Sequence, residues 1–185
     1  MWISWCAFAA CDVRTGDARC GSVCAVDPQW LTDAEQVAWR RFITVVGLLP
    51  SALDSSMRDH HGINMHEYWV LAMLSEAPEQ SLRMQELARR STASASRLSH
   101  TINRLEQRGL VLRQQSACDR RGQSATLTDA GLELVKIAAP SHVADVRRRL
   151  FDALSADDVR QLSRICDEVL KNLDPTGDRS PAVQP

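Results

Sequence analysis

Residues 82–131 read LRMQELARRSTASASRLSHTINRLEQRGLVLRQQSACDRRGQSATLTDAG, and this stretch decides the fold. Its middle predicts a helix, because Leu98, Ile102 and Leu105 recur at the spacing of one helical face. Gly109 follows directly after a basic residue, which is typical of the C-terminal end of a helix. We therefore expect one amphipathic helix that stops at this glycine.

A shorter helix is predicted just before it, joined to it by a tight turn. Met84, Leu87 and Ala88 fall on one face of this shorter helix. The intervening residues 91–94, Ser-Thr-Ala-Ser, are small and mostly polar, which suits a turn followed by a helix N-cap. Helices with so short a link cross at a steep angle, so the pair is predicted to form a helix-turn-helix.

A β-hairpin is predicted directly after the second helix. Residues 110–113 and 124–127 are strand-like runs, and the polar, glycine-containing residues 116–122 form the loop between them. A short strand around residues 82–83 is expected to pair with this hairpin, the wing of the motif. Residues 128–129, Thr-Asp, then offer an N-cap for another helix. The stretch as a whole predicts a winged helix-turn-helix.

The same stretch is strongly basic, although the whole chain is not. Nine arginines, no lysine and three acidic residues lie between Ser81 and Gly122, which gives this segment a charge of +6. The whole chain carries −1, so the remaining residues sum to −7. A basic module inside an acidic chain is the electrostatic pattern of a surface that contacts a polyanion. A merely solvated basic helix face is the alternative, which the adjoining hairpin and turn disfavour.

Three runs of this stretch resemble the MarR (multiple antibiotic resistance regulator) family of bacterial transcription factors. They are LRMQELARR, SASRLSHTINRLEQRGLV and DRRGQSATLTDAG, the last of which is similar to the family's wing signature. The resemblance extends from about Leu31 to Leu173. It implies a mostly α fold with a small β-hairpin wing, flanked by N- and C-terminal dimerisation helices.

The residues before the helix-turn-helix predict two further helices. A capping box at residues 32–35 opens a long apolar helix that ends near Gly62, with a kink or a break expected at Pro50. A second capping box at residues 64–67 opens a supporting helix that ends before Pro78. So long an apolar helix exceeds what one small core needs, which suggests a second subunit.

The residues after the wing predict two more helices. One runs from Asp129 to about Ala153, with a kink expected at Pro140. Ser155 caps the last helix, which carries apolar residues on one face and ends at Asp174. The terminal helices thus have more apolar surface than one winged domain covers, and burial against a second copy gives an isologous dimer.

The 185 residues are expected to form one domain with terminal extensions. Residues 1–30 are predicted to be a disordered, Cys-rich extension; a metal- or redox-sensing appendage and a targeting segment are the alternatives. The winged helix domain covers residues 31–174, with a DNA-binding core at 82–131 and dimerisation helices at 31–60 and 132–173. A disordered tail, residues 175–185, follows. No stretch approaches the ~20 apolar residues of a membrane-spanning helix. A DNA-binding domain makes export implausible, so a cytoplasmic protein without membrane contact is expected.

Candidate DNA contacts follow from this arrangement, since a recognition helix reads bases with its first turns. Arg97 is the first candidate for a guanine, because its planar fork matches two acceptors on one base edge. Ser94 is expected to cap the helix and bind a phosphate. The further candidates on this helix are Ser96, His100, Thr101 and, as a phosphate contact or a solvated residue, Arg104.

The wing supplies a second set of candidates. Arg120 and Arg121 at a hairpin tip suit the minor groove. The resemblance implies that Asp119 holds Arg121 in place through a bidentate pair. Arg113 and Arg83 are expected to contact phosphates. Two copies would place two recognition helices about one turn of DNA apart, so the expected partner is double-stranded DNA with an inverted-repeat operator.

The resemblance further implies a repressor that a small aromatic or phenolic ligand releases from DNA. The residues expected to face such a cleft are Trp39, Phe42, His61, His66 and Tyr68. Plain packing of the first two residues, redox control through Cys118 or Cys166, and a ligand-independent DNA-binding protein remain alternatives. No catalytic set, phosphate loop, cofactor motif or metal cluster is evident, so an enzyme is not expected.

Overall fold

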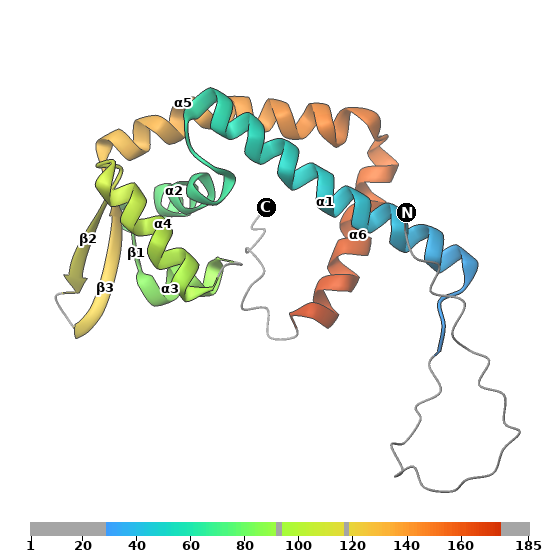
Figure 1. Ribbon diagram of the computed structural model, residues 1–185, viewed down its shortest axis with the longest axis horizontal. Coiled ribbons are helices and arrows are strands. Elements are labelled where there is room, and N and C mark those ends of the chain that lie inside the picture. Colours follow the sequence, from blue (N-terminus) through green and yellow to red (C-terminus); the bar gives the residue numbers. More distant parts are fainter. Residues whose placement is uncertain (1–28, 92–93, 117–118, 175–185) are drawn as a thin grey trace, which may run out of the picture. The chain divides into compact units, whose positions relative to one another are not determined.

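The helices and strands of the chain follow the predicted order. The structure, a computed structural model, describes residues 29–91, 94–116 and 119–174, the side chains of residues 116–122 excepted. The chain divides into two compact units, Met1–Trp39 and Arg40–Pro185. The elements (Figure 1) are α1 (Asp33–His61), α2 (Met65–Glu76), β1 (Ser81–Arg83), α3 (Met84–Arg90), α4 (Ala95–Gln107), β2 (Val111–Ser116), β3 (Asp119–Leu127), α5 (Asp129–Arg149) and α6 (Ala156–Leu173).

Helix α1 begins and ends where the sequence predicts. The Thr32 backbone N–H donates to Glu35 Oε2 at 2.7 Å, and the Glu35 N–H donates back to Thr32 Oγ1 at 3.3 Å. After His61 the chain leaves the helix at Gly62, whose φ of 66° suits glycine. Of the kink or break expected at Pro50, the break does not occur, because α1 continues through this residue. Proline removes one N–H from the helix ladder, and the hydrogen bonds on either side keep the helix intact.

The described strands form an antiparallel sheet in the order β1-β3-β2, so β3 pairs on both edges. Leu82 of β1 lies opposite Ala125, which confirms that the short strand pairs with the wing. The hairpin is longer than predicted: β2 reaches Ser116 and β3 begins at Asp119, so the loop predicted at residues 116–122 is wrong. These residues are polar and lack the alternating apolar pattern that predicts a strand. Cross-strand hydrogen bonds nevertheless extend both strands into this polar segment.

The core lies among α2, α3, α4, the sheet and the adjoining ends of α1 and α5. The predicted apolar face of α4 is buried in this core, since Leu98, Ile102 and Leu105 are each at most 1% exposed. Leu87 of α3 is equally buried. Helix α6, in contrast, has no buried residue within the chain. One apolar core therefore fixes the helix-turn-helix against the sheet.

Caps define the last two helices. Thr128 Oγ1 accepts the Gly131 N–H at 3.1 Å and begins α5, as predicted. Helix α5 ends at Arg149, earlier than predicted, and a 3₁₀ turn covers Phe151–Ala153. Ser155 then caps α6. Within the part of the chain that the structure describes, no helix is long and apolar enough to cross a membrane.

Candidate nucleic-acid interface

The first turns of α4 present their polar side chains to solvent. Ser94 is the N-cap, and its Oγ accepts the Arg97 N–H at 3.3 Å, as predicted. Ser94, Ser96, Arg97 and His100 are all exposed, whereas Leu98 between them is buried. The helix is thus anchored by its apolar face and leaves a row of donors free to meet a groove.

The end of α4 is fixed by a C-capping motif that also starts the wing. The Gly109 N–H donates to the Glu106 carbonyl at 2.9 Å, and the Leu110 N–H donates to the Leu105 carbonyl at 3.0 Å. This pair of bonds is the Schellman motif, and Gly109 takes the φ of 70° that it requires. Thr128 Oγ1 donates to the Gly109 carbonyl at 2.8 Å. The base of the hairpin is therefore held directly against the end of α4.

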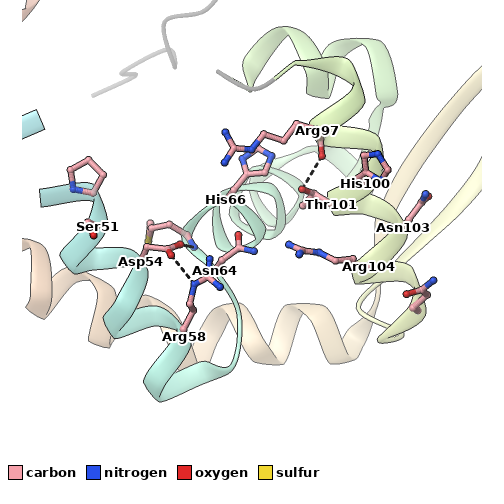
Figure 2. Close-up of a pocket in the computed structure, with 13 residues that line it drawn as sticks. Ser51, Asp54, Arg58, Asn64, His66, Arg97, His100, Thr101, Asn103 and Arg104 are labelled. Carbon is pink, nitrogen blue, oxygen red and sulfur yellow. Dashed lines mark hydrogen bonds and ion pairs between the residues drawn. The ribbon is translucent and has the colours of Figure 1, made fainter. Parts of the chain in front are cut away.

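Arg97 lies at the rim of a cavity beside α4. Figure 2 shows its side chain directed toward His66 of α2. The guanidinium makes no hydrogen bond or ion pair with any described residue. Its positive charge nevertheless reaches its neighbours, since it helps to lower the pKa of both His66 and Asp54. Among the described arginines predicted to contact DNA from α4, this guanidinium is thus the one available for a new partner.

Arg104 and Arg113 are already engaged within the protein. Arg104 Nη2 lies 2.8 Å from Oε1 of Glu67, whose side chain is 7% exposed. Arg113 Nη2 donates to Asn103 Oδ1 at 2.7 Å, and the Arg113 backbone N–H donates to Glu106 Oε1 at 3.2 Å. These two arginines, expected on charge alone to bind phosphates, tie α4 to α2 and to the wing.

The remaining predicted contacts differ in their accessibility. Thr101 is 4% exposed and donates its hydroxyl to the Arg97 carbonyl at 3.0 Å, so it offers little to DNA. Arg83 is exposed at the end of β1. The wing candidates Asp119, Arg120 and Arg121 lie in β3, but their side chains fall outside the described residues.

Helix α3 carries its own ion-pair cluster. Glu86 Oε1 lies 2.8 Å from Arg89 Nη2 and 2.6 Å from Arg90 Nε. Hydrogen bonds from these two guanidinium groups lower the pKa of Glu86 to about 2. The positive charge of α3 is therefore partly neutralised within the helix itself.

A cavity of about 890 Å³ opens between α1, the start of α2 and α4 (Figure 2). Its charged and titratable lining is mainly basic: Asp54, Arg58, His66, Arg97, His100 and Arg104.

The basic lining shifts the pKa of two groups in this cavity. Burial raises the pKa of Asp54, but the Met65 N–H, Arg58 and Arg97 together hold it below its ordinary value. Burial also lowers the pKa of His66; Arg97 and Arg104 lower it further, and Glu67 opposes them. His66 Nε2 is buried and has no hydrogen-bond partner among the residues that the structure describes. The cavity suits a small anion.

The structure separates the residues predicted to face a ligand. His66 lines the cavity, whereas Tyr68 is 7% exposed and packs on the His142 ring at 4.9 Å between centroids. His61 Nε2 lies 2.6 Å from Ser141 Oγ and is absent from the cavity lining. Trp39 and Phe42, at the boundary of the two units, are both more than half exposed.

Sequence reasoning missed the polar residues that position α4. Glu67 shows in the sequence as half of a capping box, but its second carboxylate oxygen binds Arg104, far along the chain. Asn103 and Glu106 carry no local signal of their contacts with the wing. The regular spacing of Arg104 and Arg108, one helical turn apart, was the available hint that one face of α4 meets a partner. Of the redox candidates, Cys166 is exposed on α6 and Cys118 lies outside the described residues.

Comparison with known proteins agrees with this geometry. Residues 61–122 match the model of the MarR family. Sco3205, a MarR family transcriptional regulator from Streptomyces coelicolor solved in complex with DNA, is 38% identical; the alignment covers 86% of this chain and 99% of that one, with a TM-score of 0.79. AbsC, a MarR family regulator from the same organism, is 40% identical over 80% of this chain and 100% of its own, with a TM-score of 0.76. The transcriptional repressor MprA of Escherichia coli is 29% identical over 65% of this chain and 68% of its length. The predicted resemblance is confirmed, and the chain belongs to the MarR family of winged helix-turn-helix transcriptional regulators.

Proposed function

We propose that this protein is a homodimeric repressor that binds an inverted-repeat DNA operator and is released by a small aromatic anion. The observation that carries the DNA-binding part is the contrast along α4. Its first turns expose Ser94, Ser96, Arg97 and His100, while its second half is held by the protein. A helix fixed at one end with donors exposed at the other is the arrangement that presents side chains to a major groove.

The homodimer is supported by the apolar face of α6. Ile165, Val169 and Leu173 are 49%, 43% and 72% exposed, although they recur on one side of the helix. A second copy of the chain would bury them in a two-fold interface. Two recognition helices in such a dimer would meet half-sites centred about 34–36 Å apart.

The ligand is supported by the cavity beside α4. Its basic lining favours a carboxylate or phenolate, and Arg97 belongs both to this lining and to the exposed first turns. An anion bound there would recruit the same guanidinium that the DNA needs. Ligand and operator would then exclude one another, which is how a small molecule relieves repression.

The DNA-binding part is tested with the protein's own upstream region as a labelled fragment, across a salt series. Wild type is compared with Arg97→Ala and Arg121→Ala. We expect wild-type dissociation constants of roughly 10⁻⁸–10⁻¹¹ M with a steep salt dependence, weakened by both changes. Binding that neither change affects would place the reading surface elsewhere on the molecule.

The ligand part is tested with benzoate and its neutral counterpart benzamide. Benzoate is expected to bind saturably, as measured by isothermal titration calorimetry, and to release the operator over the same concentration range. Benzamide fills the same shape without the charge, so it should do neither. Release by both compounds, or by neither, would contradict an anion site in the cavity.

A further inference from the structure

Glu67 joins two helices through a single buried carboxylate. Its Oε2 accepts the Asn64 N–H at 2.8 Å, which completes the capping box of α2. Its Oε1 receives Arg104 Nη2 of α4, also at 2.8 Å. Figure 2 shows Arg104 directed from α4 toward the start of α2, where Asn64 lies. The side chain of Glu67 is only 7% exposed, so it is out of reach of DNA.

Further contacts fix the same half of α4. Arg108, one turn beyond Arg104, donates Nη1 to the Gly62 carbonyl at 3.1 Å, in the connection between α1 and α2. Asn103 and Glu106 accept hydrogen bonds from Arg113 of the wing. The second half of α4 is therefore held on one side by the start of α2 and on the other by β2, while the polar side chains of its first turns face solvent.

The burial of Glu67 makes its partner indispensable. A buried carboxylate that loses its cation keeps the cost of desolvation without the compensating interaction, so the surrounding helices rearrange to reach water or another donor. Arg104 is the ion-pair partner that α4 supplies, and the guanidinium geometry fixes direction as well as distance. A change at either residue thus alters how α4 sits on α2.

We propose that Glu67 is a positioning residue for DNA binding: its buried ion pair with Arg104 sets the orientation of the recognition helix, and Arg104 acts through this pair instead of contacting a phosphate. The inference rests on the proposed DNA-binding function and replaces the phosphate role expected for Arg104 from charge alone. The ion pair joins the supporting helix α2 to the recognition helix α4.

Salt dependence and the sign of the Glu67 effect separate the two roles of Arg104. A phosphate contact releases counterions, so each contact that is lost makes the negative slope of log K against log salt less steep by about 0.9, and the proposed dimer would lose two. A positioning pair leaves that slope unchanged while affinity falls. Removing the negative charge of Glu67 should strengthen binding to a polyanion if charge alone matters, but should weaken it if Glu67 positions α4.

The experiment compares wild type, Glu67→Gln, Arg104→Gln and the double variant in the full chain, with Arg83→Gln as the matched control for an exposed arginine. Each single change is expected to weaken operator binding at least tenfold with the wild-type salt slope, and the double variant to recover most of the loss. Arg83→Gln should lower the slope. If Glu67→Gln does not fold, as judged by far-UV circular dichroism, Glu67→Asp takes its place. It keeps the charge but shortens the side chain, so weaker operator binding with the wild-type salt slope supports positioning, and unchanged binding contradicts it.

Amide hydrogen exchange in α4 gives a second readout that does not need DNA. Exchange should accelerate in both single variants and return toward wild type in the double variant. A reduced salt slope for Arg104→Gln together with tighter binding by Glu67→Gln would overturn the proposal. If wild type binds no operator, the proposed function fails; unchanged α4 exchange in all variants would then separately overturn the positioning role.

Discussion

Three arginines predicted from charge to contact DNA have different surroundings. Arg97 is exposed and makes no ion pair with a described residue, Arg104 pairs with buried Glu67, and Arg113 bonds Asn103. A guanidinium already held in a bidentate or buried contact loses that contact if it turns to DNA. At the scale of single residues, we therefore propose that base reading and helix positioning fall to different arginines, Arg97 and Arg104.

Arg97→Ala is predicted to remove base discrimination. If the guanidinium of Arg97 reads one base, the substitution should reduce the free energy of operator binding by about 1–3 kcal/mol. The reduction should be much smaller on an operator substituted at that base pair. Binding constants on both fragments measure this difference. Arg83→Ala is the control, since a phosphate contact weakens both fragments alike. Equal losses for Arg97→Ala on the two fragments would argue against base reading.

The ion pairs of Glu86 give a prediction for acid pH. Because Arg89 and Arg90 lower the folded-state pKa of Glu86 to about 2, below its ordinary value of 4.5, their stabilisation is complete above pH 4.5. It is lost as pH falls through about 2. Since the groups are partly exposed, each pair contributes roughly 0.5 kcal/mol. A carboxyl-carbon NMR titration should find the Glu86 midpoint below its ordinary value in wild type and higher in Arg90→Gln; an ordinary midpoint in wild type would refute the pairs.

Elements are joined at two glycines that are needed for different reasons. Gly109 has a φ of 70° and open space around it. Gly131 in α5 has an ordinary helical conformation, but an added Cβ would collide with the Leu110 carbonyl oxygen and lie 2.7 Å from Leu127 Cδ1. The first glycine is required by backbone conformation and the second by the close packing of α5 on the wing.

The two glycines should therefore respond differently to the same substitutions. Gly109→Ala should cost about 1–2 kcal/mol of unfolding free energy, and Gly109→Asn less, because asparagine tolerates the left-handed region. At Gly131 alanine should cost about 1–3 kcal/mol through overpacking, and asparagine more than alanine. Urea unfolding of the four variants measures both pairs. The same order of Ala and Asn at both positions would contradict this assignment.

At the scale of the whole molecule, the unburied face of α6 is the feature that supports the proposed dimer. Within the described residues this amphipathic helix contributes nothing to the core, although its apolar residues share one side. Exposed apolar residues in such a row mark an interaction surface. The proposed second copy would bury this face and provide the second half of the DNA-binding surface.

Ile165→Glu combined with Val169→Glu is predicted to give a monomer. Two carboxylates in an apolar interface are costly to bury, and without the dimer the gain from simultaneous binding of two half-sites, about 10²-fold or more, is lost. Sedimentation equilibrium and operator titration measure the two effects. Ser163→Glu, which places a carboxylate on another side of α6, is the control and should remain dimeric. A dimeric double variant would rule out this face as the interface.

The sequence by itself determined the elements and their ends. Periodicity placed α3 and α4, the pairs Thr32–Glu35 and Asn64–Glu67 placed two helix starts, and Gly109 placed a helix end. These signals depend on side chains and backbone groups three or four positions apart, so they act before the chain has any tertiary structure. The wing signature added the family. The polar ends of the hairpin strands were not predicted, because cross-strand pairing overrides local preference. At Pro50 the sequence left a kink or a break open, and the intact helix excludes the break.

Only the tertiary structure decided which polar residues face solvent and which hold one element against another. Glu67 lies far from Arg104 in the chain, and Asn103 meets Arg113 across an element boundary; no local pattern encodes either contact. The same holds for the cavity, where packing sends His66 into the lining and Tyr68 into the core although they are two positions apart. The periodicity of a helix tells which side chains share a face, but the burial and partner of each depend on what the fold packs against that face.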